Sequence, residues 1–221
     1  MTAQIREARI VLVDDHPMVR ERLREVIQRE AGLRVCGEAE SRAQALEVIA
    51  ATSPDLAIID LSLKGSHGLE LIKDLHSLYP QLLMLVLSMY DGVLHAERSI
   101  RAGAHGYISK QEATRKILSA IRNVLDGGLY LSDSVAKQIA SQVVGNRNRQ
   151  AVGIDRLTDR ELRVLELVGL GHTMRQIADT LHLDVKTVET YRARIKDKLN
   201  LKDATEVLQF AIRWQRNNTG P

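Results

Sequence analysis

The sequence has little cysteine, no large excess of positive or negative charge, and no long apolar run. Cys36 is the only cysteine among 221 residues, which excludes an intrachain disulfide and a cysteine-based zinc site. No apolar signal core follows the first charges, and no apolar window approaches the length of a membrane span. These absences lead us to expect a soluble, cytoplasmic protein in a reducing setting, with no membrane partner.

The charges of the chain nearly balance. The formal net charge is +3, from 31 basic and 28 acidic residues, and the pI is about 9.1. This excess alone does not indicate a nucleic-acid partner. Residues 1–132 hold 16 basic and 17 acidic residues, residues 133–153 hold 3 and 1, and residues 154–221 hold 12 and 10. The basic character therefore lies in the second half of a chain long enough for two domains.

Apolar runs alternate with amphipathic segments from residue 9 to about residue 126. This alternation predicts an α/β fold with a doubly wound, five-stranded parallel sheet. The expected strands are Ile10–Val13, Leu33–Gly37, Leu56–Ile59, Leu82–Leu87 and Gly106–Ile108. The expected helices are Pro17–Glu30, Ser41–Thr52, Leu69–Leu78, Leu94–Ala102 and Thr114–Asp126.

Two of the expected strands end on carboxylates. Asp14 and Asp15 follow the first strand, and Asp60 follows the third. The carboxyl ends of strands in an open α/β sheet face a common crevice, so the acids converge if these strands are neighbours. Mutual repulsion makes such a cluster costly in a dry site. A hard divalent cation with oxygen ligands is therefore the expected partner of these acids.

Further residues at the strand ends carry a resemblance to a known family. Ser88 follows the fourth strand, Tyr107 lies on the fifth, and Lys110 comes just after it. With the acids, and in this order, they resemble the flavodoxin-like receiver domains of bacterial two-component response regulators. The resemblance implies phosphorylation of Asp60 by a sensor histidine kinase.

The resemblance also assigns a role to each matching residue. It implies that Mg²⁺ is held by Asp14, Asp15 and Asp60. A metal neutralises the carboxylate and the incoming phosphoryl oxygens, and in-line transfer needs mostly positioning and charge stabilisation. Lys110 would supply a point charge to one phosphoryl oxygen, and the Ser88 hydroxyl would donate to another. In the family this bond draws the hydroxyl inward, and the aromatic residue that matches Tyr107 follows it.

The chain departs from the receiver pattern at a few positions. Leu63 and Lys64 stand where Met-Pro is common, and Gln111 stands where the active-site lysine is usually followed by proline. Lys64 places an additional cation near the acids, which is expected to change the lifetime of the phosphoryl group. The remaining polar candidates are four histidines, His16, His67, His95 and His105. Because Mg²⁺ prefers oxygen ligands, we expect them to be surface histidines.

The segment after Asp126 joins the two halves. We expect residues 1–130 to form the first domain, 131–153 to form a linker and 154–221 to form the second domain. Val135–Val144 could be one helix within the linker, while Gly145–Gly153 is rich in polar residues and glycine and predicts a flexible tether.

From Leu157 the apolar period becomes purely helical and predicts a small all-α domain of four helices. Thr158 with Glu161 forms a capping-box pattern that opens the first helix, which Gly169 and Gly171 end. The next helices are expected at Thr173–Leu181, Val185–Leu199 and Ala204–Trp214. Short helices joined by tight turns are typical of a helix-turn-helix unit.

These helices resemble the LuxR-type DNA-binding domain of the NarL/FixJ class of regulators. The residues that carry the resemblance are Leu157–Glu161, Ile177–Ala178, Val185–Thr190, Arg192, Ile195, Lys198 and Leu199. The resemblance implies that the third helix enters the major groove of double-stranded DNA and that dimers bind paired half-sites.

The third helix has one apolar side and one polar side. Val188, Tyr191, Ile195 and Leu199 fall at helical spacing and are expected to pack inward. The residues expected to contact DNA are Lys186, Thr187, Glu189, Thr190, Arg192, Arg194 and Lys198. The basic residues and Thr187 suit phosphates, while the early residues suit base edges. Glu189 stands where family members often carry lysine, and it can accept from cytosine N4.

Together these features predict a DNA-binding transcriptional regulator that is controlled by phosphorylation of Asp60 and dimerises when phosphorylated, rather than an enzyme. An aspartyl-phosphate phosphatase is one alternative, but such enzymes usually carry a second acid where this chain has Ser62. A phosphorylation-independent dimerisation module is the other; the intact acids argue against it, and Lys64 and Gln111 keep it open.

Overall fold

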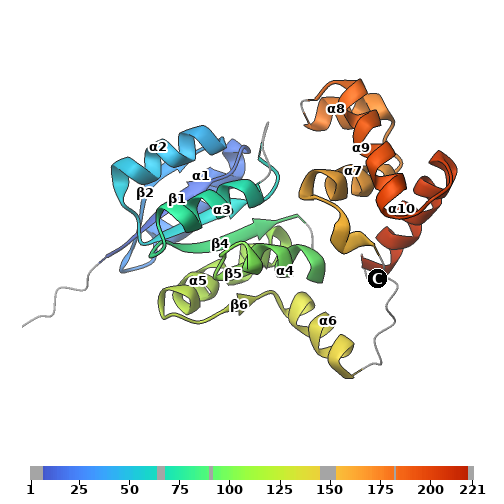
Figure 1. The fold of residues 1–221 in the computed structure, drawn as a ribbon. Coiled ribbons are helices and arrows are strands. Elements are labelled where there is room, and N and C mark those ends of the chain that lie inside the picture. The colour runs from blue at the N-terminus through green and yellow to red at the C-terminus, as the bar shows by residue number, and fades with distance from the viewer. Residues whose placement is uncertain (1–6, 64–67, 90–91, 145–152, 182, 219–221) are drawn as a thin grey trace, which may run out of the picture. The chain divides into compact units, whose positions relative to one another are not determined.

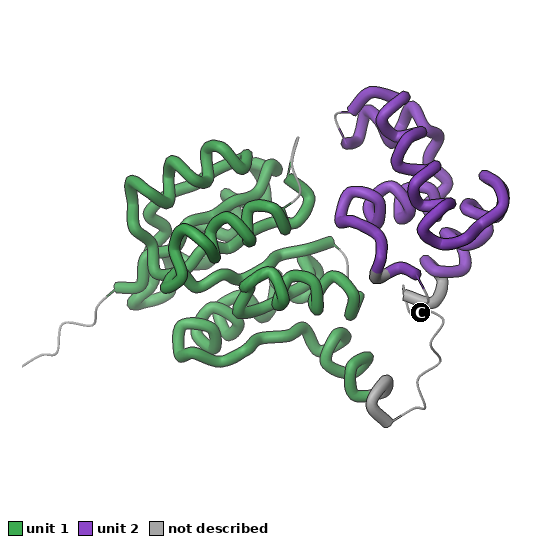
Figure 2. The backbone as a smooth tube through the Cα atoms, in the orientation of Figure 1, with its two compact units in different colours: residues 1–140 green, residues 141–221 purple. Residues whose placement is uncertain are grey.

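The computed structural model describes residues 7–63, 68–89, 92–144, 153–181 and 183–218. The chain divides into two compact units, residues 1–140 and 141–221 (Figure 2). The division lies inside the segment 131–153 that the sequence indicates as a linker.

The first unit is a doubly wound α/β fold, as predicted (Figure 1). Its elements are β1 (Ala8–Val13), α1 (Pro17–Gln28), β2 (Leu33–Ala39), α2 (Arg42–Thr52), β3 (Leu56–Asp60), α3 (Gly68–Leu78), β4 (Leu83–Ser88), α4 (Val93–Arg101), β5 (Gly106–Ser109), α5 (Lys110–Leu125), β6 (Tyr130–Leu131) and α6 (Asp133–Val144). Among the described residues the parallel sheet has the strand order β2-β1-β3-β4-β5-β6.

Helices cover both faces of this sheet, which explains why its central strands are continuously apolar. Successive residues of a strand point to opposite faces. Ile10 and Leu12 of β1 pack with α1 and α5 on one face. Val11 and Val13 pack with α2, α3 and α4 on the other. All five residues of β3 are buried, and the strand ends on Asp60.

The described sheet has six strands where the sequence predicts five. The additional strand, β6, is only two residues long and pairs in parallel with Gly106 and Tyr107 of β5. Two residues cannot display a strand period, so the sequence pattern does not reveal them. The Ser132 N–H donates to the Tyr107 carbonyl oxygen at 2.9 Å, and α6 begins at the next residue. The linker helix thus continues directly from the sheet.

Helix α5 begins at Lys110, whereas the sequence pattern predicts a start at Thr114. The Ser109 hydroxyl caps the helix by accepting the Glu112 N–H at 3.2 Å. A serine followed three residues later by glutamate is a capping signal. Lys110 therefore lies in the first turn of a helix and not in a free loop.

The second unit is all-helical, as predicted. It contains a 3-10 turn, η1 (Ile154–Arg156), followed by α7 (Asp159–Gly169), α8 (Met174–Leu181), α9 (Val185–Lys198) and α10 (Ala204–Asn218). The expected capping box opens α7: the Thr158 N–H donates to Glu161 Oε2 at 2.7 Å, and the Glu161 N–H donates to Thr158 Oγ1 at 3.3 Å. The short turn η1 was not predicted. None of the helices in the described ranges has the length and apolar character needed to cross a membrane.

Candidate functional site

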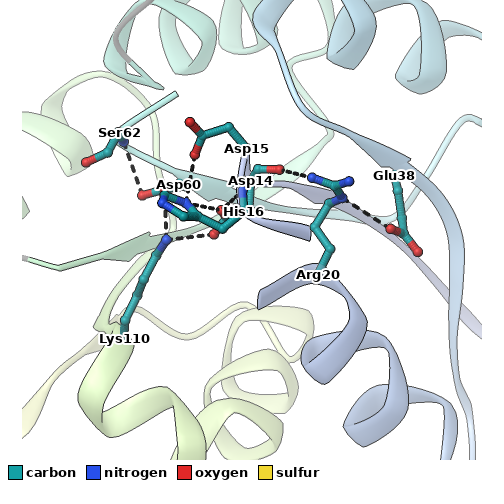
Figure 3. Close-up of polar contacts among 8 residues, drawn as sticks. All are labelled: Asp14, Asp15, His16, Arg20, Glu38, Asp60, Ser62 and Lys110. Carbon is teal, nitrogen blue, oxygen red and sulfur yellow. Dashed lines mark hydrogen bonds and ion pairs between the residues drawn. The ribbon is translucent and has the colours of Figure 1, made fainter. Parts of the chain in front are cut away.

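The candidate site lies at the carboxyl ends of β1 and β3 (Figure 3). These strands are parallel neighbours, with Val13 opposite Ile59, so Asp14 and Asp60 leave the sheet side by side. Asp14 is 1% exposed and Asp60 is fully buried. Ligand atoms of these two acids, Asp15 and His16 all lie within 4.8 Å of one another. The structure therefore brings together the three acids that the sequence analysis selects.

Lys110 reaches this cluster from the start of α5. Its Nζ donates to Asp14 Oδ2 at 2.7 Å and to Asp60 Oδ2 at 2.9 Å. Burial by itself lowers the pKa of Lys110, but the charges and hydrogen bonds of Asp60 and Asp14 outweigh it and hold that pKa above its usual value. Lys110 is therefore a fixed cation that links two strands at the site.

Asp60 has an environment of its own. Burial, and then the charge of Asp14, raise the pKa of its carboxyl above the usual range, although Lys110 and the Ser62 N–H act in the opposite direction. The Ser62 N–H donates to Asp60 Oδ1 at 3.1 Å. Helix α3 begins at Gly68, where a Cβ would clash with the main-chain oxygen of Asp60. Cations or hydrogen-bond donors at this carboxylate favour its ionised form.

The donor set fits a hard divalent cation. Carboxylate oxygens are the ligands that Mg²⁺ prefers. Asp15 Oδ1 is buried and lies 2.8 Å from His16 Nδ1, but it forms no well-directed hydrogen bond with the described residues. A buried carboxylate oxygen left in this way is costly, and a cation would compensate it. Asp14, Asp15 and Asp60 could therefore hold Mg²⁺.

The histidines differ from one another. His16 is exposed over 61% of its side chain, yet its Nδ1 also lies 3.0 Å from Asp14 Oδ1. The expectation of a surface position is wrong for His95, which is only 6% exposed on the buried side of α4. The half-buried His105 accepts the Met84 N–H at 3.2 Å. His67 and Lys64 lie outside the described residues.

Ser88 and Tyr107 are both fully buried. Ser88 is the last residue of β4, one position beyond Leu87, which lies opposite Asp60. Tyr107 lies on β5 opposite Val86 and packs in the apolar cluster under α2, α3 and α4. Ser88 thus occupies the same end of the sheet as Asp60, and the Tyr107 ring points inward.

In the second unit, α9 carries the candidate DNA contacts. Val188 and Ile195 are fully buried, which fixes the inward side of the helix. Among the candidates, the exposed ones are Lys186, Glu189, Thr190 and Arg194, and the half-buried ones are Thr187, Arg192 and Lys198. The Thr190 hydroxyl donates to the Lys186 carbonyl oxygen at 2.9 Å, within the helix itself.

Lys198 has a partner inside the unit. Its Nζ donates at 2.6 Å to Glu161 Oε2, and the Glu161 side chain is 2% exposed. Burial raises the pKa of Glu161, but the hydrogen bonds from Lys198 and Thr158 outweigh burial and leave that pKa below its usual value. Lys198 therefore links the end of α9 to the start of α7. This structural role is independent of any contact that Lys198 makes with DNA.

Two residues beside the acids, Arg20 and Glu38, were not predicted from the sequence. Arg20 of α1 donates to the main-chain oxygen of Asp14, and Glu38 of β2 pairs with Arg20. Neither contact has a sequence signal, because one ends on the main chain and the other joins residues 18 positions apart. The Ser109 cap did have a signal, the glutamate three residues later.

Comparison with known proteins agrees with this architecture. Residues 10–122 match the response regulator receiver domain, and residues 155–211 match the bacterial regulatory proteins of the LuxR family. The chain belongs to the NarL/FixJ-type two-component response regulators, which are DNA-binding transcription regulators controlled by phosphorylation.

Relatives match over nearly the whole chain. A Pseudomonas aeruginosa protein described as a transcriptional regulator is 37% identical over 208 residues, which cover 94% of this chain and 99% of that protein. Response regulator UvrY of Escherichia coli K12 is 31% identical over 205 residues, covering 92% and 93%. The oxygen regulatory protein NreC of Staphylococcus carnosus is 30% identical over 210 residues, covering 93% and 97%.

Solved structures show the same fold. A LuxR-family two-component response regulator from Aurantimonas is 35% identical, with a TM-score of 0.60, and covers 62% of this chain and 99% of its own. RcsB of Salmonella enterica, determined on promoter rprA with the phosphomimetic BeF₃⁻, has a TM-score of 0.64 at 23% identity and covers 93% of this chain and 98% of its own.

Proposed function

We propose that Asp60 accepts a phosphoryl group from a sensor histidine kinase and that this event promotes dimerisation and binding to paired DNA half-sites. The observation that carries the proposal is a fully buried carboxylate, Asp60, bound by Lys110 at 2.9 Å and grouped with Asp14 and Asp15. Residues 1–130 form the proposed receiver domain, 131–153 the linker and 154–221 the DNA-binding domain. A cytoplasmic location is part of the proposal.

The residues of the site have distinct roles in phosphoryl transfer. Asp14, Asp15 and Asp60 would hold Mg²⁺, which would supply positive charge against the carboxylate and the phosphoryl oxygens. An Asp60 oxygen attacks phosphorus, and an O–P bond forms as the P–N bond to the kinase histidine breaks, with the imidazole nitrogen keeping the electron pair. Lys110 moves from the carboxylates to a phosphoryl oxygen, and the Ser62 N–H orients Asp60.

The response to phosphorylation involves residues on β4 and β5. The Ser88 hydroxyl moves inward to donate to another phosphoryl oxygen, and the Tyr107 ring, which is buried on β5, follows that hydroxyl. This change alters the surface around α4 and α5, on which dimerisation depends. Because β6 pairs with Tyr107 and leads into α6, the linker helix also experiences any movement of β5.

The DNA interface is the outer side of α9. Lys186, Thr187, Arg192, Arg194 and Lys198 contact phosphates and supply affinity, while Glu189 and Thr190 face base edges. The exposure of Lys186, Glu189 and Arg194 supports this assignment. A further support is that RcsB, a structural neighbour, was determined bound to promoter DNA.

Labelling with a small acyl phosphate tests the proposal. Purified protein incubated with acetyl phosphate and Mg²⁺ is expected to gain one acid-stable, base-labile phosphoryl group, and Asp60→Asn is expected to gain none. Asp55→Asn is the matched control, because Asp55 precedes the same strand at its other end and accepts the Arg9 N–H. Undiminished labelling of Asp60→Asn would overturn the assignment, whereas turnover of a phosphate ester would favour a phosphatase.

A further inference from the structure

Arg20 connects α1 to the loop that carries two of the acids. Its Nη1 donates to the main-chain oxygen of Asp14 at 2.6 Å. In the contacts drawn in Figure 3, the guanidinium binds neither the Asp14 carboxylate nor the Asp15 carboxylate. It holds the backbone from which the Asp14 side chain projects and which leads into Asp15.

Glu38 of β2 holds Arg20 in turn. Arg20 Nε lies 3.3 Å from Glu38 Oε2, and Arg24 Nη1 donates to Glu38 Oε1 at 2.9 Å. The Arg20 side chain is only 15% exposed, so its charge needs compensation nearby. Glu38 supplies that compensation.

Both backbone groups of Asp14 are tied to the same edge of the sheet. Its N–H donates to the Ala39 carbonyl oxygen at 3.1 Å, and its carbonyl oxygen is bound through Arg20 to Glu38. Glu38 and Ala39 are consecutive residues of β2, opposite Leu12 and Val13. The end of β1 is therefore fixed on both sides before the acids meet a ligand.

We propose that Arg20, held by Glu38, is a positioning residue that fixes Asp14 and Asp15 for binding of a divalent cation. The identification of the acids as a metal site rests on the proposed function. Outer partners of ligating carboxylates orient those ligands, and their loss weakens metal binding. Arg20 differs from such partners in acting through the main chain, so its loss removes one of the two backbone restraints on Asp14.

Metal affinity measured on the unphosphorylated full-length chain tests this role. Binding of Mn²⁺ alone, followed by electron paramagnetic resonance, needs no phosphoryl transfer. Arg20→Gln is expected to weaken Mn²⁺ binding by roughly 10-fold, the lower end of the effect of losing an outer partner. Glu38→Gln is expected to weaken it less, because Arg20 keeps its carbonyl contact. Arg20→Lys should recover part of the affinity, since one ammonium can reach the carbonyl oxygen but does not reproduce the guanidinium fork.

Arg22→Gln is the matched control on the same helix. Arg22 Nη1 lies 3.4 Å from Glu25 Oε2 on the same helix, and the Arg22 side chain is 64% exposed. Glu25 is not one of the acids of the site. Its Mn²⁺ binding should equal that of the wild type. Equal binding by Arg20→Gln, or equal weakening in Arg22→Gln, would overturn the proposal. If Arg20→Gln does not fold by circular dichroism, Glu38→Gln and Arg20→Lys decide, and wild-type binding in both would overturn it.

Acetyl phosphate labelling separates this inference from the proposed function. In Arg20→Gln the Mg²⁺ concentration for half-maximal labelling should rise by roughly the same factor as the Mn²⁺ dissociation constant, while the rate at saturating Mg²⁺ should fall less. Unchanged half-maximal Mg²⁺ in Arg20→Gln would contradict the positioning role alone. Absence of Asp60-dependent labelling in the wild type would instead contradict the proposed function, and the Mn²⁺ comparison would still measure what Arg20 does.

Discussion

The two units carry their functional charges in opposite ways. In the first unit the side chains of Asp14 and Asp60 are 2% and 0% exposed, and both are bound by Lys110. In the second unit Glu189 and Arg194 are exposed on the outer side of α9. A buried charge depends on partners already in place, whereas an exposed charge is hydrated and screened until DNA arrives. Single changes should therefore have large effects in the first unit and small ones in the second.

The largest effect is expected from Lys110→Ala. Removing this cation leaves Asp14 and Asp60 facing each other and deprives the transferred group of a fixed charge. The rate of acetyl phosphate labelling should fall by roughly 100- to 1,000-fold, as when one preorganised donor is lost elsewhere. Lys116→Ala is the control on the same helix, because the partners of Lys116 are Glu112 and Asp133, which do not belong to the phosphorylation site. Similar labelling rates in Lys110→Ala and Lys116→Ala would contradict the expected large effect of a change at the buried acids.

One ion pair in the second unit, between the half-buried Lys198 and the buried Glu161, gives a test of the same contrast. Lys198→Met leaves Glu161 buried without its cation and should cost about 1–3 kcal/mol of unfolding free energy at neutral pH, measured by urea denaturation. Lys202→Met, which alters an exposed lysine, should cost little. A small effect in Lys198→Met would mean that Lys198 is available chiefly for DNA.

The pH dependence gives this prediction a direction. The folded pKa of Glu161 lies below its usual value, so its stabilising contribution is present above the unfolded pKa and is lost as the pH falls through the folded pKa. The wild type and Lys198→Met should therefore differ most at neutral pH and converge in acid. A difference that grows in acid would contradict the paired geometry.

Glu189→Gln is expected to change sequence preference rather than affinity as a whole. An amide can donate as well as accept, so discrimination at the contacted base pair should shift by about 1–3 kcal/mol. Selection of bound fragments from a random DNA library would measure the change. A uniform loss on all sequences would show that Glu189 does not face a base.

Arg194→Ala should have the smallest effect. Loss of one phosphate contact weakens binding to all sequences alike and reduces the slope of log affinity against log salt by about 0.9. Fluorescence anisotropy at several salt concentrations would measure that slope. An unchanged slope, or a changed sequence preference, would remove Arg194 from the phosphate-binding set.

The acid cluster could be predicted because its cause is simple. Parallel strands end together at one edge of a sheet, so carboxylates at the ends of two strands meet if those strands are neighbours, as β1 and β3 are. The capping box at Thr158 was predictable for the same reason, since both partners lie within one turn. Patterns that are local, or that repeat along an element, are visible in a single sequence.

Other features could not be predicted because the sequence carries no pattern for them. Strand β6 is two residues long, and Arg20 binds a carbonyl oxygen, which every residue possesses. His95 is buried because of its place on the inward side of α4, and its residue type gave no sign of that. The start of α5 at Lys110 was predictable from Ser109 and Glu112 but went unrecognised.

The central claim is that phosphorylation of Asp60 controls DNA binding by the second unit. The most direct test compares capture of genomic DNA fragments by the full-length wild type and by Asp60→Asn, each with and without beryllofluoride and Mg²⁺. Affinity of the wild type for the enriched fragments should rise with the phosphoryl mimic by roughly 5- to 150-fold, the usual range of coupling between two sites. Asp60→Asn should not respond. An unresponsive wild type, or an equal response from Asp60→Asn, would contradict the claim.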